Sequence, residues 1–159
     1  MDFSELIKQI KEGKIITGVE KEKIINDITR NYNIFDSNIH YLWGKLHNIE
    51  HLKIRIKADD GFYKIIKKHI KIEGELYFLI DKECFNGEAE HQLIYTKGSE
   101  ILDLLEENYW ELDEVYIFDK NYDWIISINH IFEILFVGKR LSNFVGRINS
   151  IIEAKKYII

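Results

Sequence analysis

The sequence contains no proline and a single cysteine, Cys84, among its 159 residues. One cysteine excludes an internal disulfide, which fits a reducing compartment. No apolar run approaches the roughly 20 residues that a membrane-spanning helix needs. Residues 1–14 carry charges throughout and so lack the apolar stretch of a signal peptide. From these absences we predict a cytoplasmic protein that has no membrane as a partner.

The sequence also lacks the motifs of several function classes. It has no glycine-rich phosphate loop, no serine nucleophile elbow and no dinucleotide-binding fingerprint. Its formal net charge is −5, whereas domains that bind nucleic acids are normally basic. We therefore expect no cofactor and no nucleic acid, and the acidic balance mildly favours a basic partner.

The residues that are present predict a folded protein. Apolar residues make up 46% of the chain and aromatic residues 13%. A chain of this length is most simply one domain, residues 1–159. The clearest pattern is an apolar–polar alternation from Leu112 to Gly138, interrupted at Asn121 and Asp123. It predicts a β-hairpin with strands near 113–119 and 123–129 and a third strand near 132–137.

Apolar residues at helical spacing predict several helices outside this region. The expected helices run from Phe3 to Ile10, over 18–31 with a Thr17–Glu20 capping box, from Asp36 or Ser37 to Leu46, from a Ser99 cap to Tyr109, and from Leu141 to Ile152. Residues 62–72 fit a helix or a strand, and we favour the helix. Further strands are expected over 51–57, 75–81 and 91–96. The order predicts an α+β fold, in which N-terminal helices and a C-terminal helix pack on a mostly antiparallel sheet.

One histidine motif points to metal chemistry. His47, Glu50 and His51 have the H-x-x-E-H spacing, in which two histidines bind zinc and the glutamate acts as a base. A small metal-dependent hydrolase or nuclease is therefore an alternative function. The motif straddles the expected end of a helix and the start of a strand, so the two imidazoles need not converge, and nothing marks a third ligand. We predict no metal site from it.

His130 and Cys84 are weaker catalytic candidates. His130 is near Asp119 and Asp123 in sequence, but an extended strand would place it about 20 Å from Asp123. A polar residue at a strand end is the simpler interpretation of His130, and Cys84 has no evident base. We predict no catalytic residue.

A run of acidic residues is the strongest functional signal. No lysine or arginine occurs between Lys97 and Lys120, a window that contains eight acidic residues. Such a run can form a negative surface that steers a cationic partner, although a solvated helix face is the ordinary alternative. Aromatic residues dominate the energetics of many interfaces, so we select the part of the run that contains them. The candidate binding residues are Glu106, Glu107, Tyr109, Trp110, Glu111, Asp113 and Glu114.

The hairpin region carries a family resemblance. The stretch VYIFDKNYDWIISINH and the later FVG resemble a motif of small bacterial domains of unknown function. The shared positions are Tyr116, Ile117, Asp119, Lys120, Tyr122, Trp124, Asn129, His130 and Gly138. Domains of this kind are often immunity proteins of polymorphic or contact-dependent toxin systems. Ile131 stands where the motif has a second histidine, which argues against shared catalysis.

The resemblance implies a protein-binding module that neutralises a cognate toxin by direct binding. The implied partner is a protein, for example a basic toxin domain. A third hypothesis is a regulatory domain that self-associates through the apolar segment 154–159. The sequence leaves the oligomeric state open.

Overall fold

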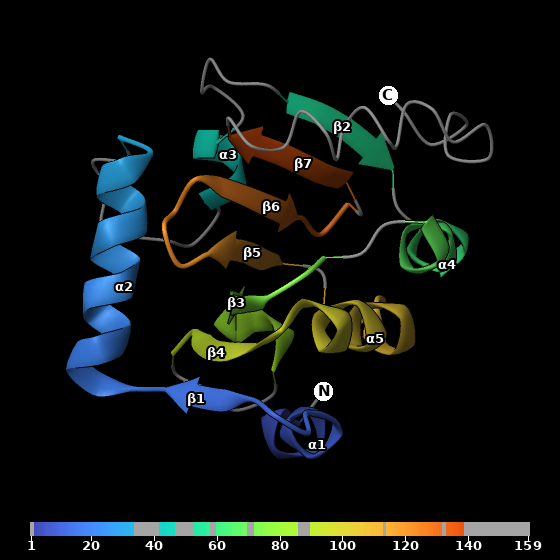
Figure 1. Ribbon diagram of the computed structural model, residues 1–159, viewed down its shortest axis with the longest axis horizontal. Helices are drawn as coiled ribbons and strands as arrows, with labels where there is room; N and C mark the ends of the chain where they lie inside the picture. Colours follow the sequence, from blue (N-terminus) through green and yellow to red (C-terminus); the bar gives the residue numbers. More distant parts are fainter. Residues whose placement is uncertain are drawn as a thin grey trace.

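The computed structural model describes residues 2–33, 42–46, 53–57, 60–69, 72–85, 90–112, 114–131 and 133–138 (Figure 1). These residues form five α-helices, one short 3-10 helix and seven strands. The helices are α1 Phe3–Gln9, α2 Gly18–Asn31, α3 Leu42–Leu46, α4 Asp60–His69 and α5 Gly98–Asn108, and the 3-10 helix is η1 Lys82–Cys84. The strands are β1 Lys14–Ile16, β2 Lys53–Lys57, β3 Glu75–Ile80, β4 Gln92–Lys97, β5 Val115–Asp119, β6 Trp124–Ile128 and β7 Glu133–Gly138.

The seven strands form one sheet in the order β1-β4-β3-β5-β6-β7-β2, and every neighbouring pair is antiparallel. This arrangement confirms the predicted α+β fold class with its antiparallel sheet. The β5–β6 hairpin closes where Asp119 Oδ1 accepts a hydrogen bond from the Asp123 backbone N–H at 2.8 Å. That turn sets the register in which Phe118 pairs with Ile125 and Val115 pairs with Ile128.

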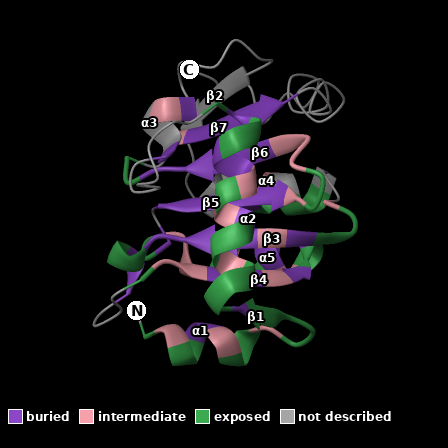
Figure 2. Cartoon of the chain, turned by 90° about the vertical axis from the view of Figure 1, so that its left-hand side faces the viewer, coloured by how far each residue is buried: buried purple, intermediate pink, exposed green. Residues whose placement is uncertain are grey.

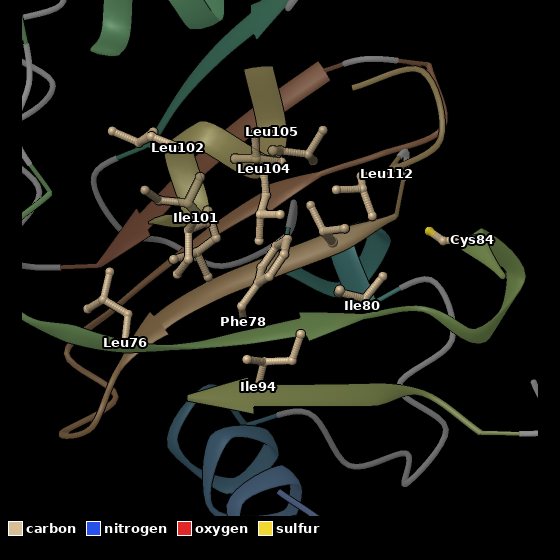
Figure 3. Packing of buried hydrophobic residues seen from close by; sticks show 14 of the residues in the cluster. Leu76, Phe78, Ile80, Cys84, Ile94, Ile101, Leu102, Leu104, Leu105 and Leu112 are labelled. Atoms are coloured by element: carbon tan, nitrogen blue, oxygen red, sulfur yellow. The ribbon is translucent and has the colours of Figure 1, made fainter. Parts of the chain in front are cut away.

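The helices cover both faces of the sheet. Side chains alternate along each strand, so one face packs on α1, α4 and α5 and the other on α2 and α3 (Figure 1). Figure 3 shows the first core, where α5 leucines meet Phe78 and Ile80 of the inner strand β3. On the other face α2 lies across the sheet with its outer side exposed (Figure 2). Burial on both faces explains why β3 is apolar on successive residues.

Gly138 ends β7 because only glycine fits there. Its φ is +131°, a value that other residues rarely adopt. A Cβ atom at this position would lie 2.4 Å from the backbone oxygen of Asp123 and 2.6 Å from Cα of Trp124. The sequence prediction that the third strand stops at Gly138 is confirmed, and the physical reason is this close approach between β7 and the start of β6.

The structure corrects several local predictions. Thr17 precedes α2 but makes no side-chain cap, and Glu20 pairs with Lys14 instead, with 3.1 Å between Nζ and Oε2. α5 begins at Gly98 after Lys97, so Ser99 is inside the helix and is not its cap. Strand β1 was not predicted, since three residues are too few to show an alternation. Residues 60–69 form the favoured helix, α4.

Two expectations fall outside the described residues. These are the helix from Leu141 to Ile152 and the apolar segment 154–159; for the helix ending at Leu46, only Leu42–Leu46 is described. Within the described parts of the chain, no helix has both the length and the apolar character needed to cross a membrane.

Candidate functional site

The C-terminal end of α5 presents an aromatic and acidic surface, which we call the Trp110 surface and define as Glu107, Tyr109, Trp110 and Glu111. The chain leaves α5 in a tight turn, in which the carbonyl oxygen of Asn108 accepts hydrogen bonds from the backbone N–H groups of Glu111 at 2.9 Å and Leu112 at 3.0 Å. Leu112 is fully buried in the core next to this turn. The turn therefore holds residues 109–111 in a fixed position at the surface.

Trp110 is 68% exposed, which is unusual for the largest apolar side chain. Its ring contacts that of Tyr109 in a tilted arrangement, with 4.6 Å between the centroids, and the Tyr109 ring in turn lies 6.0 Å from that of buried Tyr63. The indole thus contacts Tyr109, and most of its surface faces solvent. A rigid aromatic side chain in this position can give up little entropy on binding, which is typical of interface anchors.

The last turn of α5 contributes no positive charge at this helix end. The C-terminus of a helix carries a partial negative charge, and basic residues in the last turn normally balance it. The last turn of α5 has no basic residue, and both Glu107 and Glu111 are exposed. The helix dipole and the carboxylates of Glu107 and Glu111 therefore place negative charge in the turn that contains the exposed indole.

The rest of the acidic run is distributed differently. Lys67 of α4 neutralises part of it, with Nζ 3.0 Å from Asp103 Oδ1 and 2.6 Å from Glu106 Oε2. These hydrogen bonds raise the pKa of Lys67. The half-buried Glu106 is therefore an ion-pair partner of α4, and Asp113 falls outside the described residues. Negative charge is concentrated at the end of α5 and does not extend evenly along the predicted run.

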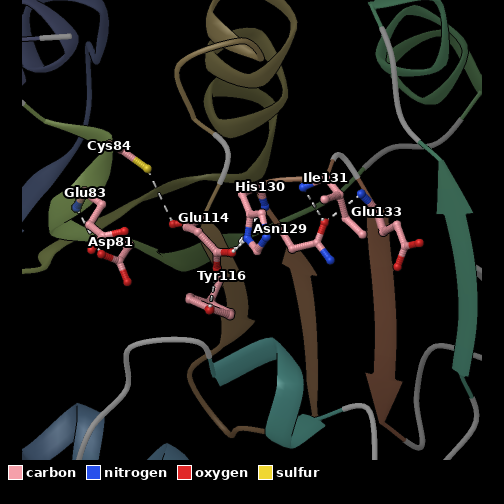
Figure 4. Close-up of polar contacts among 9 residues, drawn as sticks. All are labelled: Asp81, Glu83, Cys84, Glu114, Tyr116, Asn129, His130, Ile131 and Glu133. Atoms are coloured by element: carbon pink, nitrogen blue, oxygen red, sulfur yellow. Dashed lines mark hydrogen bonds and ion pairs between the residues drawn. The ribbon is translucent and has the colours of Figure 1, made fainter.

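Glu114 contradicts the prediction of a surface residue. It is only 3% exposed, because it precedes β5 by one residue and shares a sheet face with Tyr116. Its Oε1 accepts the backbone N–H of His130 at 3.2 Å and lies 2.8 Å from His130 Nδ1, and its Oε2 accepts the hydroxyl of Tyr116 at 3.0 Å (Figure 4). Burial raises the pKa of Glu114, although these hydrogen bonds act in the opposite direction.

His130 is held by the turn between β6 and β7. The buried Asn129 accepts hydrogen bonds at Oδ1 from the backbone N–H groups of Ile131 at 3.1 Å and Glu133 at 2.9 Å. This fixes the backbone on both sides of His130, whose side chain is 47% exposed. The hairpin register predicts this pair. Strands β5 and β6 pair residue by residue on either side of the Asp119–Asp123 turn, so residue 114 lies opposite residues 128–130. The sequence prediction rejects a pairing of His130 with Asp119 or Asp123 and does not consider Glu114.

A second carboxylate and histidine lie along the same edge of the sheet. Asp81 caps η1 by accepting the Glu83 N–H at 3.0 Å, and its own N–H donates to the Glu114 carbonyl oxygen at 2.9 Å. Cys84 also contacts that carbonyl, with its Sγ at 3.7 Å (Figure 4). His91 Nδ1 accepts the Lys82 N–H at 3.2 Å and is 3.6 Å from Asp81 Oδ2, beyond hydrogen-bond distance.

A cleft of about 550 Å³ lies between α4 and the start of α5, at the opposite end of the sheet. Lysines and carboxylates both line it, and its two lysines already have anionic partners, since Lys67 binds Asp103 and Lys97 binds Glu12. This mixture selects no particular class of ligand. No three metal-ligating side chains converge among the residues that the structure describes, and the motif His47, Glu50 and His51 falls outside them.

A family model described as "Family of unknown function (DUF6756)" matches residues 3–149. The chain belongs to this family. The match confirms the resemblance to domains of unknown function and extends it over nearly the whole chain, but it gives no link to immunity proteins. No curated protein matches the sequence.

Proposed function

We propose that this protein binds a basic protein partner through the Trp110 surface. The observation that carries the proposal is an exposed tryptophan in ring contact with Tyr109, in a segment whose Glu107 and Glu111 are also exposed and which follows a helix end without basic residues. Each of these features favours the same ligand group, a guanidinium or ammonium. A cation can stack on the indole face and at the same time be attracted by Glu107 and Glu111.

The unfavourable effect of these side chains on folding stability supports a functional role. A carboxylate in the last turn of a helix opposes the helix dipole and is destabilising by about 0.3–1 kcal/mol. An exposed indole also leaves a large apolar surface in water. Glu107 and Trp110 thus contribute little to folding where they stand, which is typical of residues retained for binding.

We further propose that the partner is the toxin domain of a bacterial toxin system, and that the protein is its immunity protein in the cytoplasm. The sequence resemblance around Tyr116–His130 and the net charge of −5 support this assignment. An acidic inhibitor would associate quickly with a basic toxin, because long-range attraction raises association rates by about 10–10³-fold. Occlusion by a surface of this kind needs no catalytic residue.

Coproduction with a toxin tests the proposal. The probe is a toxin domain whose gene adjoins the gene of this chain, produced in a sensitive host with or without this chain. We expect the wild-type chain to restore growth. The Trp110→Ala variant should lose about 10²-fold in affinity for the domain, since aromatic anchors contribute about 2–4 kcal/mol.

A matched control separates the surface from net charge. Glu107→Lys/Glu111→Lys and Glu22→Lys/Glu73→Lys change the net charge equally, and all four side chains are exposed. The first pair should slow association by tenfold or more, about the lower end of the steering effect, and the second should act much less. Equal effects of the two pairs, or growth rescue by Trp110→Ala at wild-type affinity, would contradict the assignment.

A further inference from the structure

We propose that β1 is an interface between two copies of this chain, which pair antiparallel about a two-fold axis through Ile15. Strand β1 is the last strand on one side of the sheet and lies at its lower end in Figure 1. One edge of β1 pairs with β4, and none of the described strands lies beside the other edge. A second copy of β1 would join the two sheets into one. This inference is independent of the Trp110 surface and of any toxin partner.

The hydrogen bonds between β3 and β4 show which residues of β4 face β1. The Gly98 N–H donates to the Gly74 carbonyl oxygen at 3.0 Å, and this pair continues the register in which Glu75 lies opposite Lys97. Along an antiparallel ladder, hydrogen-bonded pairs alternate with pairs that are not hydrogen-bonded. The even-numbered residues of β4 therefore bond to β3, and the odd-numbered residues direct their backbone N–H and C=O groups to β1.

The same alternation shows which groups of β1 reach the free edge. Lys14 lies opposite Tyr95. Ile16 lies opposite Leu93, so Lys14 and Ile16 both bond to β4. Ile15, between them, directs its backbone N–H and C=O away from β4, and neither group has a hydrogen-bond partner among the residues that the structure describes. The Ile15 side chain is 39% exposed. The free edge therefore offers one donor, one acceptor and an apolar side chain.

These groups are self-complementary. About a two-fold axis through Ile15, the N–H of each Ile15 meets the C=O of the other, which gives a pair of hydrogen bonds. The two Ile15 side chains then lie opposite each other, and apolar cross-strand pairs of this kind stabilise a sheet. Lys14 would lie opposite Ile16 of the second copy, and its Nζ already has Glu20 Oε2 of the same chain at 3.1 Å. No like charges of β1 would face each other in this pairing.

The opposite edge of the sheet shows how self-pairing can be prevented. Strand β2 alternates basic and apolar residues, and its basic residues are Lys53, Arg55 and Lys57. Two copies of β2 paired in the same way would place Arg55 opposite Arg55 and Lys53 opposite Lys57. Like charges directly opposite each other destabilise a strand pair, and lysines on edge strands commonly prevent such pairing. Of the two edge strands, only β1 has a charge pattern that fits a second copy of itself.

Sedimentation of the full chain at increasing concentration tests the pairing. We expect the mean mass to rise from 19.0 kDa toward twice that value between about 10 μM and about 1 mM, because one short strand pair is a small and weak interface. Ile15→Lys should stay monomeric, since two ammonium groups would face each other. Val19→Lys is the matched control. It makes the same change of charge at an apolar residue that is 81% exposed and lies outside β1, and it should associate like the wild type.

Mixed variants test whether Ile15 lies at the axis. Ile15→Glu alone should also stay monomeric, whereas an equimolar mixture of Ile15→Lys and Ile15→Glu should form dimers, because opposite charges then face each other. Circular dichroism checks that each variant keeps the fold.

Four results would overturn the proposal. These are a wild-type chain that stays monomeric over the whole concentration range, which would leave the edge to a strand of another protein, a dimer that Ile15→Lys does not weaken, an equal loss in Val19→Lys, and a mixture that does not associate. None of them would affect the proposed partner binding, which depends on Trp110.

Discussion

Glu111 and Glu114 are three residues apart in one acidic run, yet they lie in opposite environments. Glu111 is exposed on the turn that follows α5, beside Trp110. Glu114 is buried at the start of β5, where it binds Tyr116 and His130. The difference shows that a charge run in the sequence does not define a surface. The side chain's environment is set by the structural element that begins within the run.

The largest effect that separates the two residues should appear in stability. Glu114→Ala removes the acceptor for three donors and leaves buried polar groups unsatisfied, so we expect a loss of about 2–3 kcal/mol in the free energy of unfolding. Glu111→Ala should change it by less than about 0.5 kcal/mol, as for other exposed positions. Urea denaturation of both variants measures the contrast. Similar losses would show that Glu114 is not buried as described.

A smaller effect should follow from removing one donor to Glu114. Tyr116→Phe deletes a hydroxyl that bonds a buried carboxylate at 3.0 Å, and should cost about 1–2 kcal/mol. The control is Tyr95→Phe, which removes a similar bond, 3.1 Å long, to the exposed Glu75. It should cost less than about 0.5 kcal/mol, because exposed hydrogen bonds exchange readily with water. Equal costs would argue that burial does not strengthen the Glu114 network.

The stability that Glu114 contributes should also depend on pH. Burial raises the pKa of Glu114 above its ordinary value of 4.5, so folding favours its protonated form. Its contribution to the free energy of unfolding is full below pH 4.5, falls as pH rises through the raised pKa, and is constant above it. The stability of wild type relative to Glu114→Gln should therefore decline over this range. A difference that grows with pH would show that the hydrogen bonds outweigh burial.

The smallest expected change in the free energy of unfolding is an increase, whereas the substitutions above lower it. Glu107→Lys places a positive charge in the last turn of α5, where it complements the helix dipole, and should stabilise the protein by about 0.3–1 kcal/mol. Thermal unfolding at low salt measures the gain. A gain in stability together with a loss of partner binding would sharpen the distinction between residues kept for folding and residues kept for function. A loss of stability would instead indicate that Glu107 has a structural role.

Much of the fold follows from local pattern. The β5–β6 hairpin, β7 and helices α2 and α5 are long and periodic enough to be read directly from the sequence. Strand β1 has only three residues and depends on pairing with β4, which no local pattern reveals. The predicted caps were wrong because Thr17 makes no side-chain hydrogen bond to α2 and because α5 already begins at Gly98, one residue before Ser99.

The candidate sites differ in the same way. Trp110 and its neighbours were predicted because they are contiguous, and a helix end brings them together without any long-range contact. The Glu114–His130 pair joins residues 16 positions apart and depends on strand register. The turn at Asp119–Asp123 sets this register, and the pair can be predicted only when the register is followed along both strands. Long-range contacts of this kind are the part of a site that composition and spacing do not show.

Binding of a cation at the Trp110 surface is tested most directly by titrating the isotope-labelled protein with an oligoarginine peptide and following its amide and indole N–H signals by nuclear magnetic resonance. We expect saturable shifts at Trp110, Glu107 and Glu111, which disappear in Trp110→Ala and persist in Glu22→Lys/Glu73→Lys. Shifts spread over all exposed carboxylates, or none at the Trp110 indole, would contradict the account.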